Sequence, residues 1–375
     1  MCPGLVVESM FESLVPENIA TLTAYPPGKP LEELERELGI TGAIKLASNE
    51  NPLGPSPLAL EAIHSQLASL NRYPDSGAYY LKARLSRHLG IRPEQLILGN
   101  GSDEILELIV RTFLQSGEEV LSFAPSFLMY GIITQAAGGV FRPLPLKDFR
   151  VDLPALNQAL TSRSKIIIIN NPNNPTGTAF YRTEWEDFLR ALPPGVIVVL
   201  DEAYIDFVKS PEVPSGLEYL DEQLPLIGLR TFSKAYGLAG LRIGYGYGPS
   251  ALLNYLNRLR QPFNVNSLAQ VAARSALDDQ DFLQRTRQLI WDGLAYLCQE
   301  LDRLGVAYLP THANFLLIRV DRDSQELYQR MLREGVIIRA MSSYNLPEYI
   351  RVNAGLPEEN SRFLQAFKKV MGFTV

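Results

Sequence analysis

Cysteine, histidine and long apolar runs are all scarce in this sequence, and each shortage excludes a class of protein. Two cysteines, Cys2 and Cys298, are too few for a disulfide framework or a cysteine-based zinc site, and they fit a reducing cytosol. The three histidines, His64, His88 and His312, show no metal-ligand spacing, so no metal is expected. No apolar run approaches the roughly 20 residues of a membrane helix, and no secretory signal opens the chain. We therefore expect a cytoplasmic protein that does not contact a membrane.

A large excess of positive charge is also absent. The 375 residues carry 35 basic and 41 acidic side chains, a net charge of −6, which argues against a sequence-independent nucleic-acid binder. Hydrophobic residues make up 46% and charged residues 20%, as in ordinary globular proteins. At about 150 residues per domain, the length predicts two to three domains with a sizeable core.

Short apolar runs alternate with helical segments in the first two thirds of the chain. Each run fits a strand that is buried on both faces, as a mostly parallel sheet requires. Helical segments lie between them, for example around 185–192, so the pattern predicts an α/β fold. The runs cover 118–123, 165–170, 195–202 and 225–230.

The pattern changes after about residue 265. Apolar residues then recur in steps of four and three from Ile290 to Leu304, which predicts a long amphipathic helix. Strand, helix, strands and a closing helix are expected to follow as a smaller α+β domain. The first thirty residues are expected to form an extended arm rather than a helix. We thus expect an arm and the start of the small domain in 1–50, a large domain in 51–265 and a small domain in 266–375.

The segment "RTFSKAYGLAGLRIGY" (230–245) is the most informative for chemistry. Lys234 follows an apolar strand, has hydroxyl residues Thr231 and Ser233 just before it, and precedes Arg242 by eight residues. A Schiff-base lysine needs a partly neutral amine, and nearby cationic charge lowers its pKa. The two hydroxyls and Arg242 could hold a phosphate. A solvated lysine and arginine on a surface loop explain the segment about as well when it is taken alone.

The segment "LGNGSDE" (98–104) predicts a strand, a tight turn at Gly99 and Gly101, and a helix that opens at Ser102 and Asp103. Free N–H groups and the helix dipole make such a place a phosphate cradle. An ordinary helix cap is the more common explanation of Ser or Asp there. The G-x-G-x-x-G dinucleotide pattern is absent.

The segment "NNPNNPTG" (170–177) follows an apolar strand, and the segment "VIVVLDEAYIDF" (196–207) begins with one. Asp201 lies at the carboxyl end of its strand, where α/β folds place ligands. A carboxylate there could pair with the protonated ring nitrogen of pyridoxal phosphate, while Asn174 and Tyr204 donate to the 3-oxygen of that cofactor. A simple turn, a capping acid and a structural tyrosine are the alternative.

Taken together in chain order, these motifs resemble those of the fold-type I aminotransferases over nearly the whole chain. The resemblance implies a large domain with a mostly parallel sheet between helices, a smaller α+β domain, and pyridoxal 5′-phosphate as cofactor. Further segments resemble the histidinol-phosphate aminotransferases of that superfamily, and the more discriminating of them are "PFNVNSLAQ" and the paired Arg339 and Arg351. These segments are "KLASNENPLGPSP", "RYPD", "NPNNPTG", "SKAYGLAGLRIGY", "QPFNVNSLAQ", "ANFLLIRV" and "IRVNAG".

The resemblance also implies a reaction and a role for particular residues. Histidinol phosphate and 2-oxoglutarate would be interconverted with imidazole-acetol phosphate and glutamate, in histidine biosynthesis and with ping-pong kinetics. Lys234 would form the Schiff base and act as general base, and Asp201 would stabilise the pyridinium. The implied cofactor-binding residues are Gly101, Ser102, Asp103, Phe127, Asn174, Asp201, Tyr204, Thr231, Ser233, Lys234 and Arg242, with Tyr73 from the other subunit of a homodimer.

The implied substrate-binding residues are Arg351, Arg339, Asn174 and Tyr25. Arg351 would bind the phosphate or carboxylate of either substrate, Arg339 would add a second contact to the phosphate, and Tyr25 of the arm would close over it. An exposed position at a strand edge is the alternative for Arg339. The rival reactions are those of an aromatic amino-acid aminotransferase or a threonine-phosphate decarboxylase, and a rival of another class is a non-catalytic regulator with the same fold. A regulator would not need a Schiff-base lysine.

Overall fold

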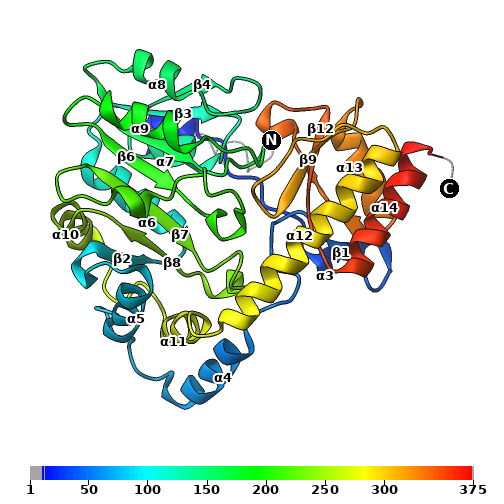
Figure 1. Ribbon diagram of the computed structural model, residues 1–375, viewed down its shortest axis with the longest axis horizontal. Coiled ribbons are helices and arrows are strands. Elements are labelled where there is room, and N and C mark those ends of the chain that lie inside the picture. Colours follow the sequence, from blue (N-terminus) through cyan, green and yellow to red (C-terminus); the bar gives the residue numbers. More distant parts are fainter. Residues whose placement is uncertain (1–10, 12, 374–375) are drawn as a thin grey trace, which may run out of the picture.

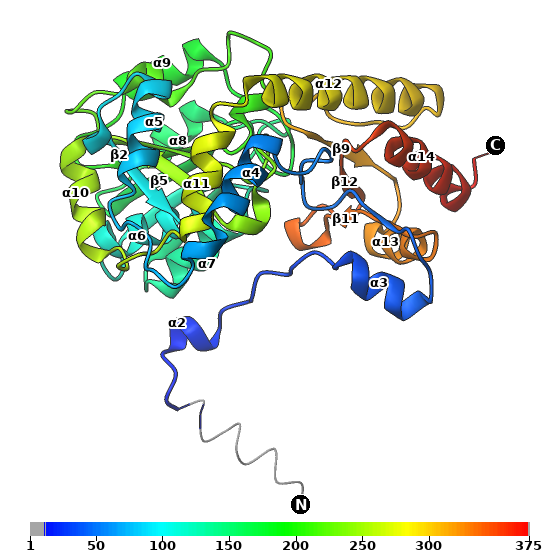
Figure 2. The ribbon, with the colours of Figure 1, turned by 90° about the horizontal axis from the view of Figure 1, so that it is seen from below.

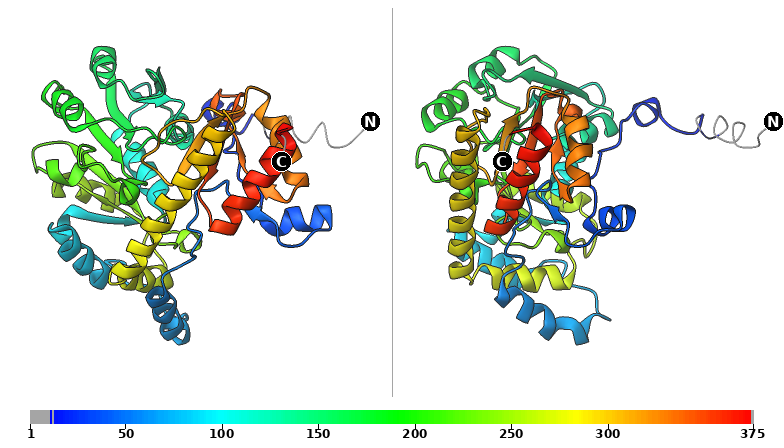
Figure 3. Two further views of the ribbon diagram at one scale, coloured as in Figure 1. Left: turned by 45° about the vertical axis from the view of Figure 1, so that its right-hand side comes forward. Right: turned by 90° about the vertical axis from the view of Figure 1, so that its right-hand side faces the viewer.

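The computed structural model describes residue 11 and residues 13–373, so Cys2 and the first ten residues of the expected arm lie outside it (Figure 1). A region built on a large sheet and a smaller region lie side by side. The helix α12 (Gln280–Arg303) runs along both of them, and contacts the short 3₁₀ helix η3 (Ile205–Phe207) in one and α14 (Pro357–Met371) in the other (Figures 1 and 3). No helix of the described residues is long and apolar enough to cross a membrane.

The large sheet has seven strands in the order β2-β8-β7-β6-β5-β3-β4. Strands β7, β6, β5, β3 and β4 are parallel neighbours, and β8 runs antiparallel to both β7 and β2. The prediction of a mostly parallel sheet in an α/β fold is therefore confirmed. The strands are β2 (Leu96–Gly99), β3 (Glu119–Ala124), β4 (Val140–Pro145), β5 (Ser164–Asn170), β6 (Ile197–Asp201), β7 (Leu226–Thr231) and β8 (Gly244–Tyr247).

Helices cover both faces of this sheet because successive strand residues point to opposite sides. Ile166 and Ile168 of β5 pack with α6, α7 and α10, whereas Ile167 and Ile169 pack with α8 and α9. Helices α4, α5 and α11 pack together beyond the β2 edge. The helices are α4 (Pro57–Gln66), α5 (Tyr79–Leu89), α6 (Ser102–Phe113), α7 (Met129–Ala136), α8 (Leu153–Ala159), α9 (Arg182–Arg190), α10 (Ser250–Leu259) and α11 (Ser267–Ala276).

The smaller region contains a three-stranded antiparallel sheet in the order β11-β12-β9. A second, parallel pair joins β1 (Ile44–Lys45) to β10 (Val336–Ile337), so the chain just before residue 50 lies with the C-terminal part. The other elements are α3 (Leu31–Leu38), β9 (Phe315–Arg319), α13 (Ser324–Arg333), β11 (Arg339–Ala340) and β12 (Tyr349–Asn353). The exact domain boundaries at residues 50 and 265 stay predictions.

The arm differs from the expectation in one respect. A single helical turn, α2 (Glu17–Ala20), interrupts it, although no helix was predicted there. Pro16 supplies a backbone angle of −58° at the start of the turn, and the Asn18 amide donates to the carbonyls of Gln135 and Ala136 at the end of α7. These contacts compensate for the lack of buried residues in α2. Residues 21–30 run along the molecule without a helix (Figure 2).

Candidate active site

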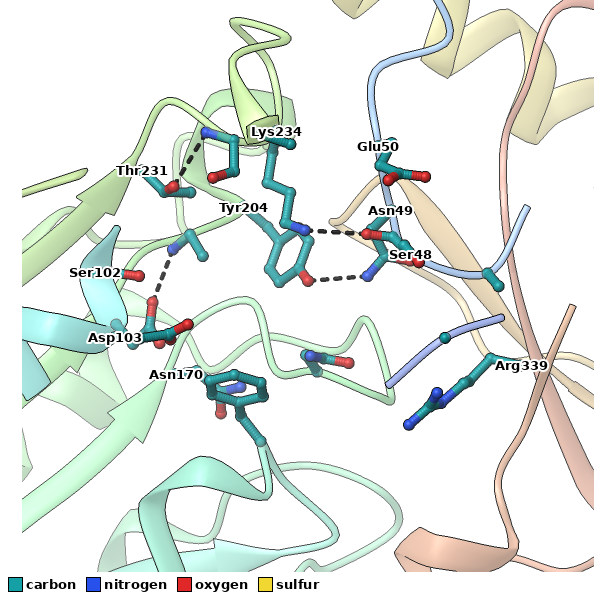
Figure 4. A pocket seen from close by; sticks show the side chains of 18 of the residues that line it. Ser48, Asn49, Glu50, Ser102, Asp103, Asn170, Tyr204, Thr231, Lys234 and Arg339 are labelled. Carbon is teal, nitrogen blue, oxygen red and sulfur yellow. Dashed lines mark hydrogen bonds between the residues drawn. The ribbon is translucent and has the colours of Figure 1, made fainter. Parts of the chain in front are cut away.

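A cavity of about 220 Å³ lies where the two regions meet. One side is formed by the carboxyl ends of β5, β6 and β7 and the N-terminus of α6, and the other by β11, β12 and the arm. Figure 4 shows Lys234 reaching across toward Ser48, with Ser102 and Asp103 on one side and Arg339 on the other. The predicted site residues that line the cavity are Tyr25, Ser102, Asp103, Phe127, Asn174, Asp201, Tyr204, Thr231, Ser233, Lys234, Arg242, Arg339 and Arg351.

Lys234 lies three residues after the end of β7 and points into the cavity. Its Nζ donates a hydrogen bond to the backbone carbonyl of Ser48, at 3.1 Å. Burial, together with the smaller effect of the positive charges of Arg351 and Arg242, lowers the pKa of the amine to about 8. Cationic neighbours were expected to lower this pKa, but burial is the larger cause. A substantial neutral fraction of the amine is therefore available near neutral pH.

An anion cradle lies beneath Lys234, at the start of α6. Gly101 is the N-cap residue, and no side chain among the described residues caps this end of the helix. The Arg242 guanidinium lies 3.5 Å from Ser233 Oγ and 3.7 Å from Asp103 Oδ2. Free N–H groups, a positive helix end and a guanidinium are the groups that bind a phosphate.

Gly101 does not line the cavity, but the cradle depends on it. Its φ of +82° lies in the region that favours glycine, and a Cβ there would lie 2.7 Å from Arg242 Nη2. Glycine therefore allows the guanidinium to approach the start of the helix.

Asp201 ends β6 and is almost fully buried. Its Oδ2 accepts a hydrogen bond from the Tyr130 hydroxyl at 2.8 Å, and its Oδ1 accepts one from the Ala203 N–H at 3.1 Å. Burial raises the pKa of the carboxyl to about 6, while these two hydrogen bonds oppose the rise. A positive charge placed beside this carboxylate would be strongly favoured.

Asn174 and Tyr204 present hydrogen-bond donors to the cavity. The Oδ1 of Asn174 accepts from Arg351 Nη1 at 2.5 Å, which leaves its Nδ2 hydrogens to donate. The Tyr204 oxygen accepts from Asn49 Nδ2 at 2.9 Å, which leaves its own proton to donate. Burial raises the pKa of Tyr204, so the phenol keeps that proton.

Two arginines form the wall on the side of the smaller region. Arg351 is buried, its Nη2 donates to the Ala47 carbonyl at 2.7 Å, and its Nε has no partner among the described residues. Arg339 lies on the edge strand β11 and donates to the Pro26 carbonyl of the arm at 2.7 Å. The Tyr25 ring lies under Arg339, with its centroid 5.8 Å from the guanidinium carbon. Arg339 is thus both an edge residue and a cavity residue.

The similarity to known proteins extends over nearly the whole chain. The model of the family "Aminotransferase class I and II" matches residues 41–367. A histidinol-phosphate aminotransferase of Desulfotalea psychrophila is 48% identical over 355 residues, which cover 94% of each chain. The histidinol-phosphate aminotransferase 1 of Nitrosococcus oceani is 46% identical, with 98% of this chain and 99% of that protein covered. The chain belongs to the histidinol-phosphate aminotransferase family, within aminotransferase classes I and II.

Solved aminotransferase structures have the same fold. The histidinol-phosphate aminotransferase of Sinorhizobium meliloti, in complex with pyridoxal 5′-phosphate, matches with a TM-score of 0.88 and 29% identity, over 96% of this chain and 98% of that one. An aspartate aminotransferase of Thermotoga maritima, 22% identical, shares the fold with a TM-score of 0.84, over 96% of this chain and 100% of that one.

The cavity of this aminotransferase fits the chemistry of a phosphorylated pyridine aldehyde. The cradle at Gly101 suits the phosphate, the buried Asp201 suits a ring nitrogen that carries a proton, and the Lys234 amine suits the aldehyde. No group of three histidine, cysteine, aspartate or glutamate side chains within the described part of the chain could hold a metal ion.

Phe127 and Tyr73 lie in very different surroundings. Phe127 lines the cavity and contacts the Tyr25 ring edge-on, at 6.1 Å between centroids. Tyr73 is 83% exposed and stacks on Phe263 at 4.7 Å, away from the cavity of its own chain.

Sequence reasoning gave no role to four groups that shape this site. Ser48 accepts from Lys234, Asn49 binds Tyr204, Glu50 lines the cavity and Tyr130 binds Asp201. Ser48, Asn49 and Glu50 belong to the segment "KLASNENPLGPSP", which was singled out only for its resemblance. Tyr130 gave no signal, because an aromatic residue inside an apolar helix usually belongs to the core.

Proposed function

We propose that this chain is a cytoplasmic, homodimeric enzyme that transfers an amino group between histidinol phosphate and 2-oxoglutarate, with pyridoxal 5′-phosphate as cofactor. The observation that carries the proposal is one cavity that combines a lysine of pKa about 8, a buried carboxylate, an anion cradle and two arginines. The names of the relatives, and the cofactor in the S. meliloti structure, support it.

The residues that would hold the cofactor divide by the part they bind. Gly101, Ser102, Asp103, Thr231, Ser233 and Arg242 surround the place for its phosphate, and Phe127 offers a ring face. Asn174 and Tyr204 supply donors for the ring oxygen, and Asp201 supplies a negative charge for the ring nitrogen. When bound, the cofactor accepts the electrons of the bond that breaks at the substrate carbon.

Lys234 is the residue that moves the proton. A neutral Nζ accepts the proton from the substrate carbon that bears the amine, and it can return that proton later in the half-reaction. With a pKa of about 8, the amine is close to the value at which it serves as both base and acid near neutral pH. The Ser48 carbonyl and the Tyr204 ring, 5.9 Å from Nζ, keep the side chain within the cavity.

The two arginines account for the pair of substrates. Arg351 is placed to bind a carboxylate or a phosphate, because a guanidinium binds either one through two parallel hydrogen bonds. Arg339 adds a second positive group, which a phosphate with three oxygens can use in addition. An uncharged aromatic side chain would leave Arg339 without an anionic partner.

The homodimer proposal concerns Tyr73. Its ring is exposed and lies outside the cavity of its own chain, and exposed Tyr79 and Tyr80 follow it on the surface. A second subunit would cover these rings and would bring a Tyr73 to the phosphate cradle of its neighbour.

The test is a substrate panel on the purified enzyme. Added pyridoxal phosphate should give a visible absorption band that is lost with glutamate and with histidinol phosphate, and recovered with 2-oxoglutarate. Carbon dioxide release from threonine phosphate without an amino acceptor would instead show a decarboxylase. A preference for phenylalanine or tyrosine over histidinol phosphate would show an aromatic aminotransferase, and the absence of a band would show a non-catalytic protein.

A further inference from the structure

Tyr130 is a buried residue that contacts the site from behind. Its side chain is fully buried in the core formed by α6, α7 and α10. Asp201 is in phase with Ile197 and Val199 of β6, which face these helices. The Tyr130 hydroxyl therefore meets Asp201 on the covered face of the sheet and donates to Oδ2 at 2.8 Å.

The start of α7 places two aromatic rings at once. The Tyr130 N–H donates to the Phe127 carbonyl at 3.2 Å, which closes one turn of the chain. The two rings then meet edge to face, with 5.6 Å between centroids and 86° between planes. Phe127 lines the cavity, whereas Tyr130 lies behind the cavity wall. This turn therefore fixes the position of the Phe127 ring and of the Asp201 carboxylate together.

The carboxylate needs such a donor because its surroundings oppose its charge. Burial raises the pKa of Asp201, and the negative charges of Asp103 on α6 and Glu202 next to it in sequence add to the rise. The Tyr130 hydroxyl and the Ala203 N–H are the hydrogen-bond donors that oppose it. The Tyr130 proton stays on the phenol, since burial and the Asp201 charge raise the pKa of that hydroxyl well above its ordinary value.

We propose that Tyr130 is a positioning residue for the transfer reaction, whose hydroxyl holds the Asp201 carboxylate ionised and in one orientation as the counter-charge of a ring nitrogen. This inference rests on the proposed function, because only a cofactor with such a nitrogen uses that counter-charge. If Tyr130 served only to fill the core, phenylalanine would serve equally well at this position. The loss of the Tyr130 hydroxyl would then leave the charge state of Asp201 unchanged.

Glu202, the residue after Asp201, also binds a buried tyrosine and so provides a matched control. Tyr247 is also fully buried, and its hydroxyl donates to Glu202 Oε2 at 2.6 Å. Glu202 does not line the cavity. Tyr247→Phe thus removes a buried tyrosine hydroxyl from a buried carboxylate, as Tyr130→Phe does, without touching Asp201.

The first measurement uses the apoprotein. The ¹³C signal of the Asp201 carboxyl, assigned by its loss in Asp201→Asn, is followed against pH. Tyr130→Phe should raise its titration midpoint by about one unit or more, as expected for the loss of a hydrogen bond to a charged group. Tyr247→Phe should leave the midpoint in place. An unmoved midpoint in folded Tyr130→Phe overturns the proposal.

A second variant works in the opposite direction and keeps the packing intact. 3-Fluorotyrosine inserted at position 130 is a more acidic phenol and a better donor, so it should lower the Asp201 midpoint. This measurement decides the question even where Tyr130→Phe fails to fold. A midpoint that stays unchanged with the fluorinated residue contradicts the proposal.

The second measurement uses the enzyme loaded with pyridoxal phosphate whose ring nitrogen is ¹⁵N. In Tyr130→Phe the nitrogen signal should move toward its unprotonated position, and kcat should fall about tenfold or more with a smaller change in KM. Tyr247→Phe should change neither. If the wild-type chain fails to bind the cofactor or to transaminate, the proposed function itself is refuted. If the wild type is active but the nitrogen signal of Tyr130→Phe is unchanged, only the proposed role of Tyr130 is refuted.

Discussion

Arg339 of β11 and Arg351 of β12 lie directly opposite each other in the antiparallel ladder of the smaller region. Directly opposed residues share a face of the sheet, so both guanidinium groups lie in the same wall of the cavity. Two like charges placed this close repel each other unless an anion lies between or beside them. The wall therefore favours a bound anion, and the proposed function would place an anionic substrate group there.

The first prediction separates the two arginines. Arg351→Ala should impair glutamate and histidinol phosphate alike, and it also frees Asn174 Oδ1. Arg339→Ala should weaken histidinol phosphate by about 1.5–3 kcal/mol, the usual loss for a charged hydrogen bond, and should spare glutamate more. The check is kcat/KM for both substrates in both variants, with Arg319→Ala on β9 as control. A larger loss for glutamate in Arg339→Ala would contradict the assignment.

The second prediction concerns Lys234. Lys234→Ala should abolish multiple turnovers while the protein stays folded, because the variant lacks the amine that carries the proton. Steady-state activity and circular dichroism are compared with the exposed-lysine control Lys369→Ala. Turnover close to that of the parent enzyme would refute the role.

The third prediction concerns Asp201. Its pKa is raised from 3.8 to about 6, so in the apoprotein the folded state binds its proton more tightly than the unfolded state does. That contribution to stability is present below pH 4 and is lost as the pH rises through 6. At pH 8, apo Asp201→Asn should thus be more stable than the parent by up to roughly 3 kcal/mol, at ~1.4 kcal/mol per unit.

Denaturant unfolding of both apoproteins at pH 4 and pH 8 measures this difference. The same variant should still bind the cofactor but lose most of its activity, because an amide does not stabilise a ring charge as a carboxylate does. Equal stability at pH 8 would refute the argument about burial, and full turnover would refute the role in catalysis.

The fourth prediction concerns Gly101. Gly101→Ala should weaken cofactor binding at least tenfold, because its Cβ would lie 2.7 Å from Arg242 Nη2 and its φ is +82°. Gly240→Ala is the control, since its Cβ would meet nothing within 4 Å. Cofactor titration by absorbance gives both dissociation constants. Equal values in the two variants would show that the cradle does not depend on Gly101.

The fifth prediction tests the shared site. When Tyr73→Phe and Lys234→Ala subunits are mixed, a Tyr73 that acts across subunits leaves one complete site in each mixed dimer. Activity should then exceed the average of the two separate variants, and mixtures made with exposed Tyr79→Phe serve as control. A fully active monomer, or no gain on mixing, would refute a shared site.

The sequence predicted the parts of this fold that depend on local pattern. Continuous apolar runs identified β5 and β6, and the heptad-like steps after Ile290 identified α12, although that helix begins earlier, at Gln280. Strand β8 was not predicted, because "GYGY" contains two glycines, which are rare in strands. Its Gly244 is explained only by the fold, since a Cβ there would lie 2.6 Å from the Ser102 nitrogen.

The same limit applies to the site. Lys234 follows β7, Asp201 ends β6 and Arg242 lies between β7 and β8. Each carries recognisable chemistry, so their residue types suggest their roles. Tyr130 and Asn49 act through partners 71 and 155 residues away, and no local pattern encodes such a pairing. The turn α2 depends in the same way on a contact with α7.

The contacts of the segment 47–49 determine when the cavity can form while the chain is being synthesised. The Ala47 carbonyl binds Arg351 and the Asn49 N–H binds Asn353, and each pair is separated by 304 residues. Ribosomes make the chain from its N-terminus, and contacts between distant residues form slowly. All seven strands of the large sheet have been synthesised once Tyr247 is made. The side of the cavity that β12 forms cannot meet the side formed by the large sheet until β12 is made. The cavity is therefore completed only after β12 has been made, and a chain truncated before residue 351 lacks the Arg351 side of the cavity.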